Sequence, residues 1–446
     1  MTTQALYSSF RFSLAINFGE TVIGDVPADA AAWVAAEGTD VFRFKPDEAG
    51  IDYITGFAAV ANEDMQPRLF EVDVPHQGLP TADGGQMVTR LWSTGAGYTD
   101  DTQVNGGAPT VMGRMLEHAL GASALGHHTT VAAVGGPTSI TLASASNLEA
   151  GYIIWIAKPS APTKPYPAQV LTSDGLGAIT IDRTLAPDLT IEVGDVVYGS
   201  EMSWPNPAAM VNPLDPAYST ISMLYAMGED ELGDGHVWMV GGAHLALGEW
   251  ALERGQQPKI TWPILAARGY PQGDPLTPTI PQFTGPIEGT NLDVPAIGRG
   301  TRVRLVDYES TDNNCTSAFS ASFDPGVPVV AEDGVTECDE GAPGRISYRT
   351  EPGDTMLTLT VALTDEQQER WQGTAENWRP RLLSCTYWQQ APVGHAWCLH
   401  MRKCFLMQPP TPVTDGVNKW ELVIQATADA AQSTEALAAK FIIARA

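Results

Sequence analysis

The sequence contains few positively charged residues. It has 25 lysines and arginines against 52 aspartates and glutamates, which gives a formal net charge of −27. Proteins that grip nucleic acid carry a basic face that contacts the phosphates. The charge balance excludes such a face, and a polyphosphate ligand would be repelled at long range.

Long apolar runs are also missing. Nowhere do 18 apolar residues follow one another, and the first residues lack a basic start that leads into an apolar run. We therefore expect a soluble, unexported protein with no membrane anchor. The cysteine spacing matches no disulfide framework or zinc pattern, which favours reduced, buried thiols. The five cysteines are Cys315, Cys338, Cys385, Cys398 and Cys404.

Catalytic motifs are absent too. The sequence has no GxSxG elbow, no HExxH, no phosphate loop and no dinucleotide fingerprint. The strongest metal candidate combines His395, Cys398, His400 and Cys404. In a strand the sulfurs of Cys398 and Cys404 would lie roughly 20 Å apart, too far for zinc bonds of about 2.3 Å. Core thiols beside a hydrogen-bonded histidine are the favoured interpretation, and we expect no enzyme activity, metal or cofactor.

The sequence is rich in glycine and proline, which end strands and form turns. Its 43 glycines and 33 prolines separate many alternating runs, which favours a mainly β fold with a few short helices. The segment APTVMGRMLEHALG predicts one helix that stops at Gly121. The segment LTDEQQERW predicts another, with Thr364 as N-cap and Gln367 in the capping-box position.

Changes in pattern along the chain predict three domains. Residues 1–122 and 201–275 form a discontinuous first domain, and residues 123–200 hold five short strand-like runs that indicate a small inserted β-barrel or sandwich. A segment rich in proline and glycine at 269–289 contains the boundary of a second large domain, residues 276–446. The echo between GTDVFRF and GTRVRLV suggests that the large domains are duplicates. His127 and His128, at the start of the insertion, are predicted to be solvated loop residues.

The stretch YSTISMLYAMGEDELGDGHVWMVGGAHLALGEW, residues 218–250, predicts a long hairpin. Its first strand places Ile221, Met223, Tyr225 and Met227 on one apolar face. A hairpin this long with unpaired edges would aggregate unless neighbouring strands complete the sheet. Closure into a barrel removes the edges, and several chains can close a barrel that one chain cannot. Four acidic residues occupy the tip: Glu229, Asp230, Glu231 and Asp234.

The order of these motifs resembles the major tail tube proteins of long-tailed, siphovirus-like bacteriophages. The likeness rests on the APTVMGRMLEHALG helix, a GDVVYG strand, an NPLDP turn, the hairpin and a GQQPKITWPI strand. It is clearest for residues 105–270 and looser for 315–446. The resemblance implies β-sandwich domains, duplicated in this chain, with an inserted module on the outer wall. It also implies that hairpins of neighbouring subunits, here with Ile221, Met223, Tyr225, Met227, Trp238 and Val240, form one barrel around a channel.

The resemblance further implies how the chain assembles. Three chains with two tube domains each, or six chains, would form a ring, and rings would stack into the tail tube of a virion assembled in the cytoplasm of a host bacterium. The partners would be other copies of the chain and tail proteins such as tape measure and terminator. Genomic DNA would pass through without specific binding, since an acidic wall does not hold phosphate. The acidic tip would line the bore, meet the next ring, or simply point to solvent.

Two other classes of function stay open at this point. One is a multi-domain β-sandwich binding protein of a virion or bacterium that attaches to carbohydrate or a host surface. Its sugar-stacking platforms would be Trp155, Trp238, Trp371 and Trp378. The other is a hydrolase whose carboxylates are brought together only by the fold.

Overall fold

A computed structural model gives the fold of the chain. It describes residues 12–19, 30–36, 41–44, 51–55, 85–90, 102–144, 148–185, 188–206, 220–227, 236–253, 259–271, 301–308, 313–326, 329–333, 345–350, 353–372, 380–389, 391–392, 394, 396–413, 419–432 and 434–446. Strands dominate these residues and the helices are short, so the predicted mainly β fold class is confirmed. None of the helices described is long and apolar enough to cross a membrane.

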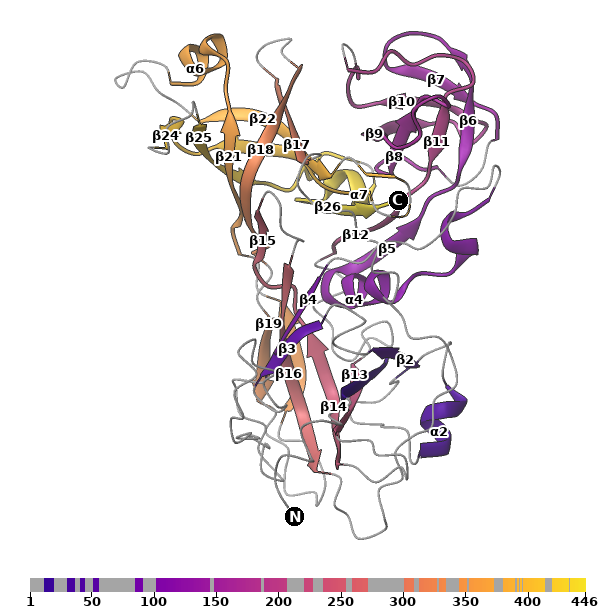
Figure 1. Ribbon diagram of the computed structural model, residues 1–446, viewed down its shortest axis with the longest axis vertical. Coiled ribbons are helices and arrows are strands. Elements are labelled where there is room, and N and C mark those ends of the chain that lie inside the picture. Colours follow the sequence, from indigo (N-terminus) through magenta and orange to yellow (C-terminus); the bar gives the residue numbers. More distant parts are fainter. Residues whose placement is uncertain are drawn as a thin grey trace.

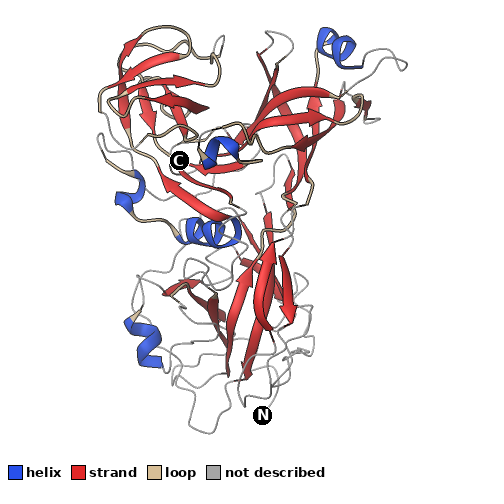
Figure 2. Cartoon of the chain, turned by 180° about the vertical axis from the view of Figure 1, so that it is seen from behind, coloured by secondary structure: helices blue, strands red, loops and turns tan. Residues whose placement is uncertain are grey.

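Most of the described strands form an open sheet and two closed barrels. Figure 1 shows the barrels in the upper part of the molecule and the open sheet below them, with helix α4 between the two levels. Figure 2 shows the same arrangement from behind. The chain thus combines two units that close on themselves with one that does not.

The open sheet contains the predicted hairpin. Its order is β2 (Val41–Phe44), β1 (Phe12–Asn17), β13 (Ile221–Met227), β14 (His236–Leu245), β16 (Lys259–Pro271), β4 (Gly85–Arg90) and β3 (Ile51–Thr55), with every pair antiparallel. Strands from the first 90 residues therefore flank strands that follow the insertion. In the pairing registers of the described residues, β2 pairs only with β1 and β3 only with β4, so these two strands form the outer edges.

Helix α4 (Val111–Leu120) covers the upper end of this sheet. The hydroxyl of Thr110 caps its start by accepting a hydrogen bond from the Gly113 amide. It ends at Gly121, whose φ of 85° is a left-handed conformation that favours glycine. The predicted helix and its stop are confirmed. Its buried face contributes Val111, Met112, Met115, Leu116, Ala119 and Leu120 to the main core.

The middle of the sequence forms the first closed barrel. Its strands are β6 (Thr129–Val134), β7 (Ser139–Leu142), β8 (Ile153–Ala157), β9 (Tyr166–Ser173), β10 (Ala178–Ile181) and β11 (Val196–Tyr198). The chain enters from β5 (Gly121–Leu125) and leaves into β12 (Glu201–Pro205), and these two strands pair with each other. Five of the strands match the predicted runs, whereas β6 does not correspond to any of them.

The prediction that His127 and His128 are solvated is wrong. They are only 9% and 2% exposed. His127 bridges to Gln103, and the Gly199 amide donates a hydrogen bond to Nδ1 of His128 over 3.2 Å. Both histidines precede a strand that the sequence pattern did not reveal, and their segment pairs with Thr102 and Gln103 instead of lying in solvent.

The C-terminal part forms the second closed barrel. Its ring of antiparallel pairs runs through β17 (Thr301–Asp307), β18 (Asn313–Asp324), β21 (Thr355–Ala362), β25 (Lys419–Ala426), β23 (Trp397–Leu406) and β22 (Arg381–Gln389), which returns to β17. Buried and half-buried residues alternate strictly along β21 and β25, as expected for strands with one face in a core.

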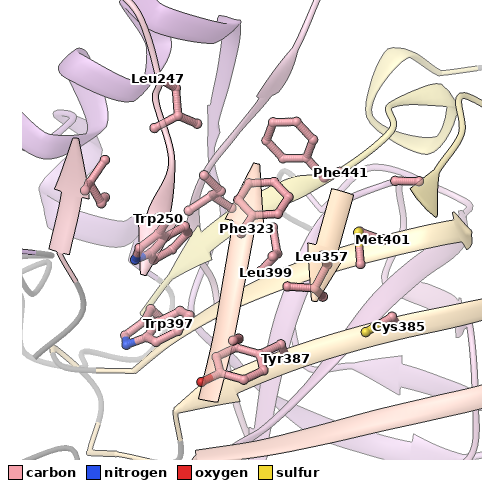
Figure 3. Close-up of a cluster of buried hydrophobic side chains, with 14 of the residues drawn as sticks. Leu247, Trp250, Phe323, Leu357, Cys385, Tyr387, Trp397, Leu399, Met401 and Phe441 are labelled. Carbon is pink, nitrogen blue, oxygen red and sulfur yellow. The ribbon is translucent and has the colours of Figure 1, made fainter. Parts of the chain in front are cut away.

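Side chains fill the second barrel. Figure 3 shows Leu357, Cys385, Tyr387, Leu399 and Met401 pointing into the same buried cluster. At one end the rings of Trp250 and Trp397 lie 5.0 Å apart, and those of Phe323 and Phe441 are also 5.0 Å apart. The interior is therefore filled by the side chains of a hydrophobic core.

Further elements join these units. Strand β15 (Trp250–Glu253) pairs with both β16 and β18, and β26 (Ile442–Arg445) lies between β12 and β23.

Strands β19 (Val329–Asp333) and β20 (Arg345–Thr350) form a separate hairpin. The predicted second helix is confirmed as α6 (Asp365–Gln372). The remaining elements are α2 (Ala30–Ala35), the 3-10 turn Val104–Gly107, β24 (Thr411–Pro412) and α7 (Glu435–Ala438). The duplication of the large domains stays a prediction, because the first domain contains an open sheet and the second contains a closed barrel.

Candidate functional site

The predicted assembly hairpin is present as β13 and β14. In its register Met223 faces Val240 and Tyr225 faces Trp238. The structure describes the backbone of Tyr225, Met227, Trp238 and Val240 but not the placement of their side chains. The tip with Glu229, Asp230, Glu231 and Asp234 lies outside the described residues. The role of these side chains between subunits stays a prediction.

The argument that the hairpin has unpaired edges is wrong for this strand pair. Residues 222–227 of β13 pair with β1, and residues 238–245 of β14 pair with β16. Strands of the same chain therefore supply both neighbours: β1 from far away in sequence, and β16 from the segment that soon follows the hairpin. The open edges lie farther out, at β2 and β3. In the part of the chain that the structure describes, β2, β3 and residues 265–271 of β16 have a strand neighbour on one side only, so a contact between chains through this sheet could use these edges.

The base of the hairpin belongs to the core. Ile221, Ser222 and Met223 are each at most 1% exposed. The amide of Asn17 donates a hydrogen bond of 3.1 Å to the Ser222 hydroxyl, which satisfies both polar groups inside the protein. Both faces of β13 are thus covered at this end. Ile221 and Met223 act here as packing residues of one chain.

Two histidines meet where helix α4 contacts the hairpin. The rings of His118 on α4 and His244 on β14 have centroids 4.6 Å apart. Burial lowers the pKa of His118 to about 4, and burial together with His118 holds the pKa of His244 well below its usual value. The two rings are therefore neutral at pH 7. Protonation of both would place two like charges side by side at this junction.

A buried ion pair joins the start of α4 to the last strand. Arg445 and Glu201 are each 2% exposed, and Nη2 of Arg445 donates to Oε2 of Glu201 over 2.6 Å. The carboxylate also accepts 2.8 Å hydrogen bonds from the amide and the hydroxyl of Thr110. A Cβ atom at position 113 would collide with Glu201, so Gly113 permits this approach. One carboxylate thus joins β12, β26 and the helix cap.

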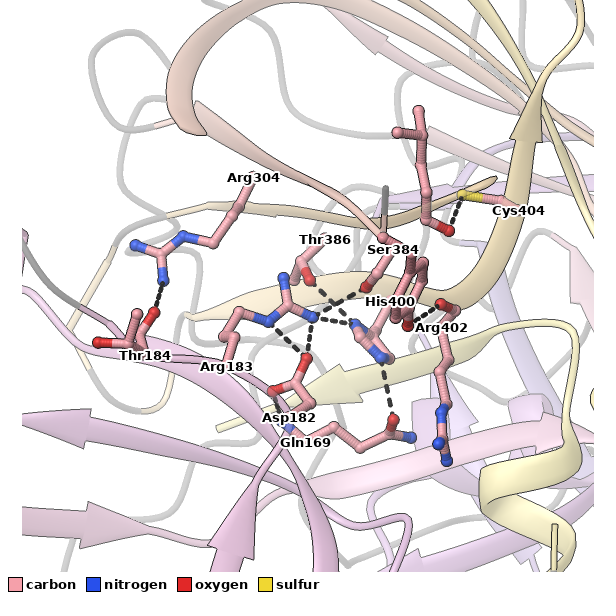
Figure 4. A network of polar contacts seen from close by, with 12 residues as sticks. Gln169, Asp182, Arg183, Thr184, Arg304, Ser384, Thr386, His400, Arg402 and Cys404 are labelled. Carbon is pink, nitrogen blue, oxygen red and sulfur yellow. Dashed lines mark hydrogen bonds and ion pairs between the residues drawn. The ribbon is translucent and has the colours of Figure 1, made fainter. Parts of the chain in front are cut away.

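A second buried polar network connects the two barrels (Figure 4). Arg183 of the inserted barrel pairs with Asp182, and its Nη2 donates to the Ser384 hydroxyl over 3.1 Å. Arg304 of the C-terminal barrel donates to Asp188 over 2.8 Å. Buried charges need partners because leaving water is costly. Each guanidinium here reaches from one barrel to the other or to a neighbouring carboxylate, so the network fixes how the barrels sit together.

His400 lies at the centre of this network. Its Nδ1 is 2.9 Å from the Thr386 hydroxyl and 3.4 Å from Nη2 of Arg183, and its Nε2 is 3.2 Å from Oε1 of Gln169. Arginine only donates, so Nδ1 accepts and the proton sits on Nε2. Burial and Arg183 lower the pKa of His400 to about 3. His400 therefore serves as a neutral link between the barrels.

Apolar contacts accompany the network. One hydrophobic cluster contains the core of the inserted barrel, with Trp155 and Ile156, together with Trp388, Cys398 and Ile442 from the C-terminal unit. The inserted barrel therefore covers the outer face of β22 and β23. The hydrophobic core that it shares with the C-terminal unit fixes its position in the molecule.

The residues considered for other chemistry are mostly buried. Cys398 and Cys404 are fully buried, and burial raises the pKa of both thiols. His395 lies outside the described residues. In the part of the chain that the structure describes, no three His, Cys, Asp or Glu side chains are grouped to hold a metal. Trp155 and Trp371 are 0% and 2% exposed and cannot stack on a sugar, while the side chains of Trp238 and Trp378 are not described.

The buried charges Arg183, Glu201, Arg304 and Arg445 were not singled out from the sequence. An isolated charge inside an apolar strand, such as Arg445 in FIIARA, is the signal that could have revealed one of them. Comparison with known proteins adds no identification: no protein-family model matches the chain, and no curated protein is significantly similar to it.

Proposed function

We propose that the chain is a structural virion protein that self-assembles into stacked rings, which form the tail tube of a bacteriophage. One observation carries this proposal. Two units of the chain close into barrels, whereas the sheet around the long hairpin ends in the outer strands β2 and β3, which have one partner each in the described residues. Open edges are aggregation templates that proteins either cover or use for association. Further copies of the same chain would cover these edges in a closed ring.

The charge supports the same proposal. A net charge of −27 disfavours phosphate contacts, and each such contact would release counterions and slow a moving nucleic acid. The acidic tip with Glu229, Asp230, Glu231 and Asp234 would face the bore or the next ring. Side chains fill the C-terminal barrel, so in this proposal the bore would lie between chains. The ring would contain three chains with two tube domains each, or six. We propose a role without catalysis or cofactor, with tape measure and terminator proteins as further partners.

Electron microscopy of the purified full chain tests the proposal. Negative-stain images should show rings or tubes of uniform bore, and native mass spectrometry of the smallest ring should give three or six copies. A chain that stays monomeric at every concentration, as seen by analytical ultracentrifugation, would overturn self-assembly. Binding of glycans by such a monomer would instead support the attachment protein, although its Trp155 and Trp371 are buried.

A further inference from the structure

The buried pair of Arg445 and Glu201 leaves hydrogen-bonding groups unused. Nη2 of Arg445 donates to Oε2 of Glu201 over 2.6 Å and to the Thr110 hydroxyl over 2.9 Å. Nε and Nη1 of Arg445 are also buried, and they have no hydrogen-bond partner in the part of the chain that the structure describes. Both nitrogens carry N–H groups that can only donate. A cation that is 2% exposed therefore has donors without an acceptor.

The side chain of Asn105 leaves an acceptor unused beside this arginine. Asn105 belongs to the 3-10 turn Val104–Gly107, and its Nδ2 donates to Oε2 of Glu201 over 3.4 Å. An ionised carboxylate only accepts hydrogen bonds, so Nδ2 must face Glu201 and Oδ1 must point elsewhere. Oδ1 is buried and has no donor among the described residues. The unused acceptor of Asn105 and the unused donors of Arg445 therefore flank the same carboxylate oxygen.

The backbone of the turn holds Asn105 in this position. Its φ of 54° lies in the left-handed region, which asparagine adopts more readily than most residues. The Gly106 amide donates to the Gln103 carbonyl over 3.1 Å, and the Ala108 amide donates to the Asn105 carbonyl over 3.4 Å. These bonds close the turn on both sides of Asn105 and keep its side chain beside Glu201.

The charges around the site select its ligand. Arg445 and Glu201 neutralise each other, so a further anion would lie beside the carboxylate and a cation beside the guanidinium. Burial makes either arrangement costly. The ligand must accept a hydrogen bond from Arg445 and donate one to Oδ1 of Asn105. Water is neutral and does both, and a buried water typically makes about three hydrogen bonds to polar groups that lack other partners.

We propose that an ordered water molecule binds between Arg445 and Asn105 and links the turn before α4 to strand β26. It accepts from Nε or Nη1 of Arg445 and donates to Oδ1 of Asn105. The same junction contains the Thr110 cap of α4 and Glu201, the first residue of β12, so the water completes the hydrogen bonds where the chain leaves the inserted barrel. This inference goes beyond the proposed function and does not depend on assembly.

A crystal structure of the full chain tests the site directly. Density for a water should lie within hydrogen-bond distance of Arg445 and of Oδ1 of Asn105. A direct contact between these two side chains would overturn the proposal, and so would missing density at a resolution that shows other buried waters. Crystals grown in sodium bromide identify the ligand, because an anomalous bromide peak at the site would show an anion in place of water.

Nuclear magnetic resonance tests the site in solution. Magnetisation should pass from a bound water to the N–H groups of Nε or Nη1 of Arg445. The Nε–H of Arg183 is a matched internal control, because Arg183 is also buried but donates to Asp182. Transfer to Arg445 and none to Nε–H of Arg183 would support the proposal. Loss of the transfer at Arg445, as at Arg183, would overturn it, whatever the assembly state of the chain.

Discussion

Residues Glu201 and Arg445 pair deep inside the protein, where neither charge reaches water. Arg445 would lose its partner if the carboxylate were removed, and an uncompensated buried charge costs far more than a lost surface contact. The pair also holds the hydroxyl and amide of Thr110 at the start of α4. It therefore affects the helix and two strands together.

We expect Glu201→Gln to lower the free energy of unfolding by about 3–5 kcal/mol. Urea denaturation followed by tryptophan fluorescence measures this loss. The matched control is Glu192→Ala, because Glu192 pairs with Lys158 but its side chain is 69% exposed. That change should cost only about 0–1 kcal/mol. Equal effects of the two variants would contradict the role assigned to burial.

Single residues also show where prediction from sequence ends. The thiols of Cys398 and Cys404 and the hydrogen-bonded His400 lie in the core, as their positions in an apolar strand indicated. Arg183 could not be foreseen, since its contact with His400 spans 217 positions of the chain. The sequence of one strand predicts which of its residues are buried. It does not predict which residue of another domain will be the polar partner of a buried side chain.

Helix α4 and strand β14 meet through the rings of His118 and His244. The pKa of His118 is about 4 in the folded chain against an ordinary value of 6.5. Between these values the unfolded chain binds more protons than the folded chain, so stability is retained above pH 6.5 and lost as the pH falls toward 4. His128 and His400, with pKa values of about 4 and 3, act in the same direction.

The free energy of unfolding should therefore fall between pH 6.5 and 4.5, by up to about 1.4 kcal/mol per pH unit for each such histidine. His118→Phe removes one of these groups and should make the fall less steep, whatever its effect at pH 7. Urea titrations at several pH values measure the slope. Equal slopes for the variant and the unmodified chain would show that the junction does not sense pH.

The hairpin and helix α4 show that single elements can be predicted from sequence more easily than the segments they pack against. Helix α4 was predictable because its apolar spacing, cap and glycine stop are all local. The strands β13 and β14 were predictable from alternation, but the pairing of β13 with β1 was not, because pairing between distant segments leaves no local pattern. Lysine at Ile221 or Met223 should disrupt the folded chain itself, since both residues are buried in the core.

The molecule as a whole carries a net charge of −27, and assembly must bring such charges together. Salt screens this repulsion, because the Debye length falls from about 10 Å at 0.1 M to about 3 Å at 1 M ionic strength. Contacts through strand edges and apolar side chains depend less on salt. Self-association of this chain should therefore be favoured by salt.

We expect sodium chloride at 1 M to lower the critical concentration for ring or tube formation relative to 0.1 M. Sedimentation of the assembled fraction measures it, with sucrose at matched viscosity as the control for solvent effects. Dissociation of the assemblies at high salt would contradict this expectation and would indicate that attraction between opposite charges holds the copies together.

The paired strands β5 and β12, between which the inserted barrel begins and ends, have a practical consequence. These antiparallel strands hold the two ends of the insertion side by side. A different compact module whose own ends lie close together could therefore replace the present one. A foreign module would nevertheless have to shield Trp388 and Cys398, which now lie beneath the native barrel. A module grafted between β5 and β12 therefore needs an apolar surface on the side that would face Trp388 and Cys398.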